Sequence, residues 1–268
     1  APENPVLLQK NGLEIALTTH GLKDKKKFRE NLAKVIERGL AKRDALAALT
    51  TTPAKLAGVA DQLGTVEPGK LANLIVVEGD YFDPKAKLKG LWIEGRWTTF
   101  EPEKLAWVDK KEEDDKEEKD DEKPDDKKED KADARLARSP IGEHNVLEPA
   151  AVLIRNATLW TSSKRGVLKN HDLLIADGKI KKIGRALQQP DNAHVIDAKG
   201  KHVTAGLIDA HNHSMILGGV NEGTLPSSAM VSIGDVVNSE SPEIHRQLAG
   251  GLTVANLLHG SANPIGGQ

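Results

Sequence analysis

The chain of 268 residues contains no cysteine and few aromatic residues, and each scarcity excludes a class of protein. Without cysteine it is neither a disulfide-stapled miniprotein nor a cysteine-based zinc module. Aromatic residues make up only 3% of the chain, and lysine and arginine form no clustered stripe. The sequence therefore does not predict a surface that binds nucleic acid. No run of 18 apolar residues occurs, and the sequence therefore predicts no membrane-spanning helix.

Charge is concentrated in one segment, residues 109–131, in which 14 side chains are acidic and 8 are basic. Such a segment has too little apolar surface to offset the entropy of ordering, so we expect a disordered linker over residues 109–149. A spacer is its simplest role, and an acidic docking tail or a divalent-ion buffer is the alternative. The near-neutral total of the chain thus combines two weakly basic segments with an acidic linker.

Before the linker, the first pattern is a continuous apolar run at residues 11–17, which is typical of a buried strand in a parallel sheet. Apolar residues at helical spacing then predict a helix over residues 25–39 and another over 43–49. A third helix is expected to begin at Thr52, because threonine can cap the free amides and the following proline fits the first turn. Gly58 is expected to end it.

A two-residue period follows on both sides of the linker. It predicts strands at residues 72–79 and 89–100 before the linker and from Ala151 to Ala205 after it. Two tight hairpin turns are expected, at Glu94-Gly95 and at Asp177-Gly178. Because strands lie on both sides of the linker, the pattern predicts either one β-sandwich assembled from two distant parts or two half-sandwiches.

The residues that carry chemistry are His211 and His213, at the end of the apolar stretch HVTAGLIDAHNH. Side chains two apart in a strand project to the same face, so both imidazoles can reach one metal ion at about 2.0–2.1 Å. A solvent-facing or hydrogen-bonded pair is the alternative, since a chain with nine histidines produces such pairs by chance. The position at the carboxyl end of a barrel-type strand favours the metal pair.

Three neighbouring features are weaker candidates. Asp209 is expected to orient a metal ligand or to cap the end of the strand. His259 and Asn263 lie in the loop after a second apolar strand, where they are candidates for contact with substrate. The glycine-rich end of this loop, Gly266-Gly267, could bind an oxyanion through backbone amides or could simply form a turn.

The stretches ADGKIKKIG and VIDAKGKHVTAGLIDAHNH resemble the opening of the amidohydrolase superfamily, and of its imidazolonepropionase-like branch in particular. In that family sandwich strands lead into the first barrel strand, which carries a His-x-His metal motif. Ala205-Gly206 stands where the family usually has Pro-Gly. The first part of the chain, above all LGTVEPGKLANLIV, resembles the opposite end of the same family: the eighth barrel strand, the last helices and the closing sandwich strands.

The part that resembles the family's C-terminal end thus precedes the part that resembles its N-terminal end. This order has two explanations: a junction fragment of a tandem two-unit protein, which we favour, or a permuted arrangement within one unit. The implied fold is α/β plus β, with partial (β/α) barrel segments and a composite β-sandwich domain built from both sides of a disordered linker. The implied parts are the last barrel strand and C-terminal helices (1–58), the closing strands (59–108), the linker (109–149), the opening strands of a second unit (150–205) and its first barrel strands, truncated (206–268).

The resemblance implies a metal-dependent hydrolase that cleaves a C–N bond in an amide or cyclic amide by metal-activated water. The cofactor would be a divalent metal, zinc in first place, and its ligands here would be His211 and His213. His20 occupies the position of the family's metal-binding aspartate in the first unit, which is therefore expected to be degenerate. The general base and the other ligands are expected beyond Gln268, so the chain alone is expected to bind metal weakly and to be inactive.

The alternative function is a non-catalytic structural or interaction segment with a degenerate barrel. The expected partner is a small-molecule substrate rather than nucleic acid, and its identity is not encoded in these residues. A homo-oligomer and an extracytoplasmic location are both compatible with the sequence.

Overall fold

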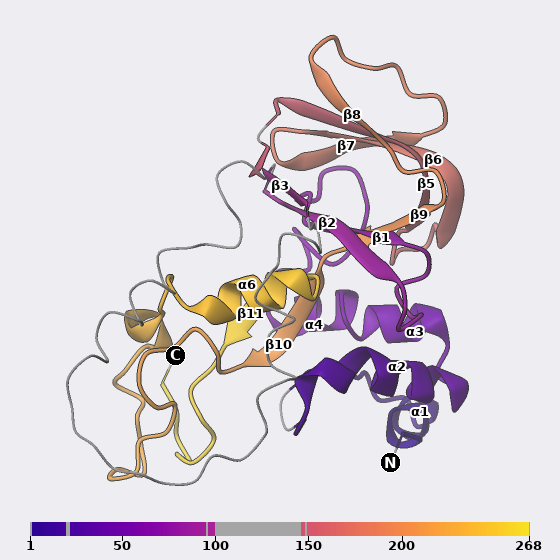
Figure 1. Ribbon diagram of the computed structural model, residues 1–268. Coiled ribbons are helices and arrows are strands. Elements are labelled where there is room, and N and C mark those ends of the chain that lie inside the picture. The colour runs from indigo at the N-terminus through magenta and orange to yellow at the C-terminus, as the bar shows by residue number, and fades with distance from the viewer. Residues whose placement is uncertain (1, 20–21, 95, 100–145, 148, 268) are drawn as a thin grey trace, which may run out of the picture.

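A computed structural model describes residues 2–19, 22–94, 96–99, 146–147 and 149–267 (Figure 1). The first helices of the chain, α1 to α4, fall within residues 4–56 and lie below the main sheet in this view. They are α1 (Asn4–Lys10), a 3-10 turn (Lys25–Lys27), α2 (Phe28–Glu37), α3 (Lys42–Ala47) and α4 (Thr51–Leu56).

The predicted helices over residues 25–39 and 43–49 are confirmed by α2 and α3. The start predicted for the third helix is wrong by one residue, because α4 begins at Thr51. Its N-cap residue, Thr50, makes no side-chain capping bond, since its hydroxyl donates instead to the Leu46 carbonyl at 2.8 Å. Gly58 follows the helix with a φ of +71°, the left-handed conformation expected of a terminating glycine.

Among the residues that the structure describes, the main sheet has nine strands, and most of its pairs are antiparallel. Its path runs β4-β3-β2-β1-β9-β5-β6-β7, and β8 pairs with β5 beside that path. The strands are β1 (Leu74–Glu78), β2 (Lys87–Ile93), β3 (Arg96–Thr99), β4 (Val146–Leu147), β5 (Ala151–Trp160), β6 (Val167–Ala176), β7 (Lys179–Gly184), β8 (Ala193–Asp197) and β9 (Lys201–Ala205). The predicted hairpin turn at Asp177-Gly178 is confirmed, with φ of 50° and 68° at its two residues.

Strands from both sides of the charged segment share this sheet. β1, which precedes the segment, pairs antiparallel with β9, which follows it, from Leu74 opposite Ala205 to Glu78 opposite Lys201. Strands from both sides of residues 100–145 therefore lie in one sheet, which is the coarser part of the predicted composite β-sandwich. The linker predicted over residues 109–149 lies outside the described residues except at its end, where Val146–Leu147 form β4 and correct the predicted boundary.

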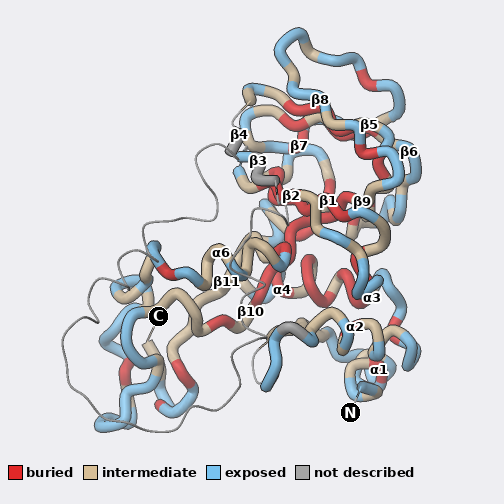
Figure 2. The backbone as a smooth tube through the Cα atoms, viewed as in Figure 1, coloured by how far each residue is buried: buried red, intermediate tan, exposed pale blue. Residues whose placement is uncertain are grey.

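Each face of β1 is buried in a different core, because successive side chains of a strand point to opposite faces. Leu74 and Val76 lie in a core inside the bent sheet, together with apolar residues of β2, β5, β6, β7 and β9. Ile75 and Val77 lie in a second core, between the sheet and helices α2 and α3. Figure 2 shows the consequence, a buried backbone through β1 and its neighbours.

A second, two-stranded parallel sheet follows β9: β10 (Leu207–Asn212) pairs with β11 (Leu252–Leu257), and helix α6 (Pro242–Ala249) connects them across a long loop. This is a strand–helix–strand unit of the kind from which parallel barrels are built. The described residues contain no closed barrel.

The buried strand predicted at residues 11–17 is wrong, because this segment forms no ladder with any strand that the structure describes. The end of the segment is hydrogen-bonded to the helical layer: the amide of Leu17 donates to the carbonyl of Ala48 at 3.0 Å. Within this run Ile15 and Leu17 are only partly buried, against the core beside the helices, while Leu13 is 54% exposed.

Candidate metal centre

β10 delivers the predicted metal pair at its carboxyl end. The strand begins with two buried residues, Leu207 and Ile208, which anchor its backbone before the polar end. His211 and His213 follow on the same face, and both are only partly exposed. Their imidazole rings stand edge to face, with centroids 4.7 Å apart and an angle of 89° between the planes.

The two rings turn the same nitrogen toward each other. Nε2 of His211 lies 2.9 Å from Nε2 of His213, and Nδ1 of His213 lies 2.8 Å from the Leu258 carbonyl oxygen. A carbonyl can only accept, so Nδ1 of His213 carries the proton, and in the neutral ring its Nε2 keeps a lone pair. In this arrangement Nε2 of His211 is the donor of the contact between the rings.

The geometry fits a shared cation. Two nitrogens 2.9 Å apart can both lie about 2.0–2.1 Å from one ion, at an angle of about 90°. The Leu258 carbonyl holds His213 in the tautomer that coordinates through Nε2, which is the usual outer-shell support of a metal-binding histidine. Among the described residues no group of three or more His, Cys, Asp or Glu side chains surrounds such a position, so the pair is accompanied there by no third ligand of these types.

A polar network supports the strand end from the opposite face. Buried Asn212 donates to Oδ2 of Asp209 at 3.2 Å and to the side-chain oxygen of Gln247 on α6 at 3.3 Å. Its own oxygen accepts from the backbone amide of Ser214 at 2.8 Å. Asp209 also accepts from the backbone amide of His211 at 3.2 Å. Gln247 was not predicted from the sequence, because a single polar residue on an amphipathic helix carries no motif.

The first part of the chain reaches the same strand end. The hydroxyl of Thr18 donates to the backbone carbonyl of His211 at 3.2 Å, across 193 residues of sequence. The amide of Ile208 donates to the carbonyl of Leu49 at 2.9 Å. His20, the predicted degenerate metal position, lies outside the described residues.

The two candidates for substrate contact lie in the loop after β11. Asn263 is buried, and its amide bridges the loop to residues 222–225: Nδ2 donates to the carbonyls of Glu222 and Leu225, each at 2.9 Å. The ring of His259 packs so closely against Gly266 that a Cβ added there would lie 1.7 Å from Nε2. Gly266 is thus required by packing.

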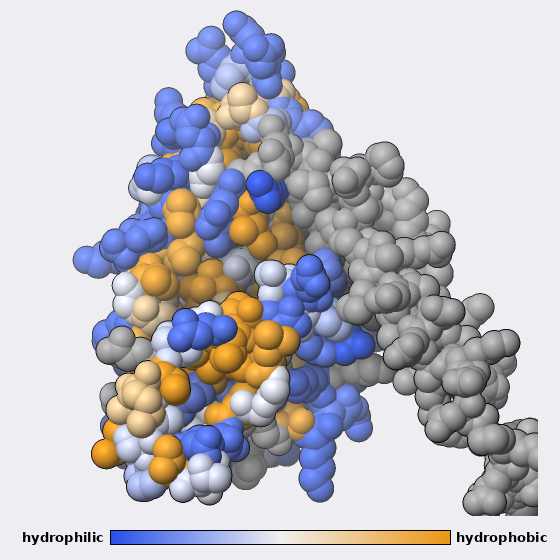
Figure 3. Space-filling view, turned by 90° about the vertical axis from the view of Figure 1, so that its left-hand side faces the viewer, coloured by the Kyte–Doolittle hydropathy of each residue, from blue (hydrophilic) through white to orange (hydrophobic). Residues whose placement is uncertain are grey.

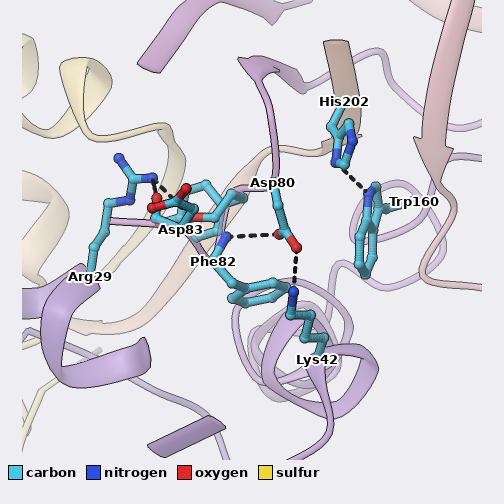
Figure 4. A network of polar contacts seen from close by, with 8 residues as sticks. Arg29, Lys42, Asp80, Phe82, Asp83, Trp160 and His202 are labelled. Atoms are coloured by element: carbon cyan, nitrogen blue, oxygen red, sulfur yellow. Dashed lines mark hydrogen bonds and ion pairs between the residues drawn. The ribbon is translucent and has the colours of Figure 1, made fainter. Parts of the chain in front are cut away.

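A second polar cluster lies between the helical layer and the sheet (Figure 4). Asp80 pairs with the ammonium of Lys42, and Nε1 of Trp160 donates to Nδ1 of His202 at 3.1 Å. Burial lowers the pKa of His202 below its usual value; the carboxylate of Asp80 opposes this shift and Lys42 adds to it. The Trp160 contact also needs a neutral ring, because protonated Nδ1 could not accept.

His202 should therefore make stability depend on pH. Its pKa is lower in the folded chain than in the unfolded chain, so its stabilising contribution is present above the unfolded pKa of about 6.5 and is lost as the pH falls through the folded value. We expect H202N, which keeps an acceptor near the position of Nδ1 but cannot titrate, to lose less stability between pH 7.5 and pH 5. Urea unfolding of both proteins across this range measures the difference, and equal losses would contradict it.

In the part of the chain that the structure describes, no helix is long and apolar enough to cross a membrane. The structure thus combines a bent, mostly antiparallel sheet, a parallel strand–helix–strand unit and a histidine pair at the end of its first strand. These are features of a mixed α/β protein that carries a histidine pair at the carboxyl end of a parallel strand.

Comparison with known proteins agrees with this class. Residues 7–98 match the Amidohydrolase family. A dihydroorotase of Halalkalibacterium halodurans is 45% identical over 73 residues, which are 27% of this chain and 16% of that protein. Amidohydrolase tasK of Hapsidospora irregularis is 30% identical over 140 residues, 43% of this chain and 14% of that protein. An adenine deaminase of Clostridium botulinum is 40% identical over 68 residues, 25% of this chain and 11% of that protein.

Among solved structures, an amidohydrolase from Thermotoga maritima is similar over 34% of this chain and 24% of its own, with 33% identity and a TM-score of 0.32. The chain spans at most 16% of the length of the curated relatives named above.

Proposed function

We propose that this chain is part of a metal-dependent hydrolase of the amidohydrolase type, which cleaves the C–N bond of an amide or cyclic amide. One observation carries the proposal: two imidazole nitrogens converge at 2.9 Å at the carboxyl end of a parallel strand. The family match over residues 7–98 supports it. Two relatives are named a dihydroorotase and an adenine deaminase, and these names favour a substrate with a nitrogen-containing ring.

The residues of this chain would hold and orient the metal. His213 would offer Nε2 and is fixed by the Leu258 carbonyl, and His211 would offer Nε2 once its proton has moved to Nδ1. A divalent ion of the zinc type, when bound, lowers the pKa of bound water to about 7 and polarises a carbonyl. Asn212 and Gln247 would keep the end of β10 in place behind the pair. A general base and at least one more ligand are still needed, because catalytic zinc usually has three protein ligands.

Metal titration of the 268-residue chain tests the role of the pair. We expect weak, stoichiometric binding of Co²⁺ or Zn²⁺, because two ligands hold zinc less firmly than three. H211A and H213A should each abolish it, which isothermal titration and the visible spectrum of bound Co²⁺ would show.

H194A is the matched control, because His194 is an exposed histidine on β8, and it should bind metal as the unaltered chain does. Unchanged binding by both H211A and H213A would remove the ligand assignment. Hydrolysis of an amide by the chain alone, lost in H211A, would show instead that its site is complete.

A further inference from the structure

We propose that Gln247 is a positioning residue for the histidine pair. With Asn212 and Ser214 it forms a ring of side-chain hydrogen bonds, and this ring fixes the backbone on both sides of His213. That the pair binds a metal ion rests on the proposed function. The ring itself stands on contacts within residues 207–258, and one of the measurements below detects its effect without metal.

The ring runs in one direction through three side chains. Nδ2 of Asn212 donates to Oε1 of Gln247 at 3.3 Å, Nε2 of Gln247 donates to Oγ of Ser214, and the Ser214 hydroxyl donates to Oδ1 of Asn212. Each member thus donates one hydrogen bond within the ring and accepts one. Hydrogen bonds in such a sequence polarise one another in the same sense, so the ring is stronger than three separate contacts.

Asn212 sets the direction of the ring. Its second amide proton goes to Oδ2 of Asp209 at 3.2 Å, and its oxygen also accepts from the backbone amide of Ser214 at 2.8 Å. The two donors and the two lone pairs of this buried side chain are therefore all used. Reversal of the Asn212 amide would turn its NH₂ group toward the backbone amide of Ser214, and reversal of the Gln247 amide would turn its NH₂ group toward that of Asn212. The ring therefore allows one orientation of each amide.

His213 lies one residue beyond the strand. β10 ends at Asn212, whose carbonyl accepts from the amide of Leu258 at 3.0 Å. The two chain neighbours of His213, Asn212 and Ser214, are both members of the ring. The ring thus fixes the peptide units before and after His213, while the Leu258 carbonyl fixes its imidazole. Because the two Nε2 atoms of the pair lie only 2.9 Å apart, a small rotation of this backbone would separate them.

Helix α6 holds Gln247 within reach of the strand end. Leu248, the next residue, packs against the core between the sheet and the helices. After the helix the amide of Gly251 donates to the Leu248 carbonyl at 2.8 Å, and the Gly251 carbonyl accepts from the amide of Leu207 at 3.1 Å. The segment that carries Gln247 is therefore bonded to the start of β10 by its backbone and to the end of β10 by the ring. The position of α6 thereby sets the geometry of the histidine pair.

Metal titration of Q247L and S214A, each in the 268-residue chain, tests the ring. Leucine fills similar space without an amide, and alanine at position 214 removes the hydroxyl that links the other two members. We expect each change to raise the dissociation constant for Co²⁺ by about 10-fold or more, the usual effect of removing a group that supports a metal ligand. S214T, which restores a hydroxyl, should recover most of the affinity lost in S214A.

Nuclear magnetic resonance of the metal-free proteins reports the state of the His213 ring. In the unaltered chain Nδ1 of His213 carries the proton that the Leu258 carbonyl accepts, so the two ring nitrogens should have well-separated chemical shifts. In Q247L and S214A we expect both tautomers to be populated and the two shifts to approach each other. A role of the ring in stability alone would leave these shifts unchanged.

R246A is the matched control, because Arg246 is an exposed residue of the same helix that pairs with Glu243, outside the ring. It should leave both the Co²⁺ affinity and the shifts of His213 as they are. Unchanged affinity and unchanged shifts in both Q247L and S214A would overturn the proposal, and so would equal changes in R246A. Shifts that approach each other in variants of a chain that binds no metal would support the ring and overturn only the metal-binding role of the pair.

Discussion

W92A is expected to lower the free energy of unfolding by about 3–5 kcal/mol, the usual cost of truncating a fully buried tryptophan. Trp92 is 1% exposed and lies on β2, where its side chain belongs to the core shared with β5, β6 and β9. The cavity would lie between residues from both sides of the charged segment. The loss should therefore appear in one cooperative transition of the whole chain.

Urea unfolding followed by far-ultraviolet circular dichroism measures this effect without relying on tryptophan fluorescence. L56A is the control, because Leu56 is 64% exposed at the end of α4 and its truncation should cost no more than about 0.5 kcal/mol. A second transition in W92A, with one part of the chain unfolding at the unaltered midpoint, would show that this core does not join the residues before the charged segment to those after it.

Most strands of the fold could be predicted from the sequence, because period-two patterns and glycine turns are local signals. The hairpin at Asp177-Gly178 is the clearest example, since both residues adopt the positive φ that its turn requires. The segment at residues 11–17 could not be placed, because an apolar run does not show which element it packs against. Its neighbour is the helical layer at Ala48, and no local pattern encodes that contact.

The histidine pair could be predicted because both residues lie at the end of one strand, two residues apart. Its supports could not, since they come from distant parts of the chain: a backbone carbonyl at Leu258, a side chain of α6 and a hydroxyl at Thr18. A backbone carbonyl has no sequence signature at all. The pairing of β1 with β9 was one of two arrangements that the strand pattern allowed, and only their contact selects between them.

The C-terminal part of the chain exposes apolar side chains. Figure 3 shows apolar side chains gathered on the face of the molecule that lies on the left in Figure 1. Six large apolar residues of the C-terminal part are exposed: Leu217, Leu225, Met230, Val231, Val237 and Ile265. The strand β11 is only half-buried along its whole length. Parallel strands are normally covered on both faces, so this part of the fold is less enclosed than the main sheet.

G206V is expected to destabilise the chain by about 1–3 kcal/mol or somewhat more, because the site has no room for a side chain. A Cβ at Gly206 would lie 2.2 Å from Oγ1 and 2.4 Å from Cγ2 of Thr253 on β11. The clash falls where β9 leads into β10, next to the hydrogen bond from Gly206 to Asn73. Relief by moving either strand would shift the strand end that carries His211 and His213.

A smaller partner should relieve the clash, which separates this cause from a general intolerance of change at Gly206. We expect G206A to lower the free energy of unfolding, as G206V does. The cost of G206A should be smaller in the T253G protein than in the unaltered chain. A double-mutant cycle from urea unfolding gives this coupling directly, since the two residues are in contact. Strictly additive losses would mean that β10 and β11 do not approach at this point, and metal titration of the same proteins would show whether the histidine pair moves with them.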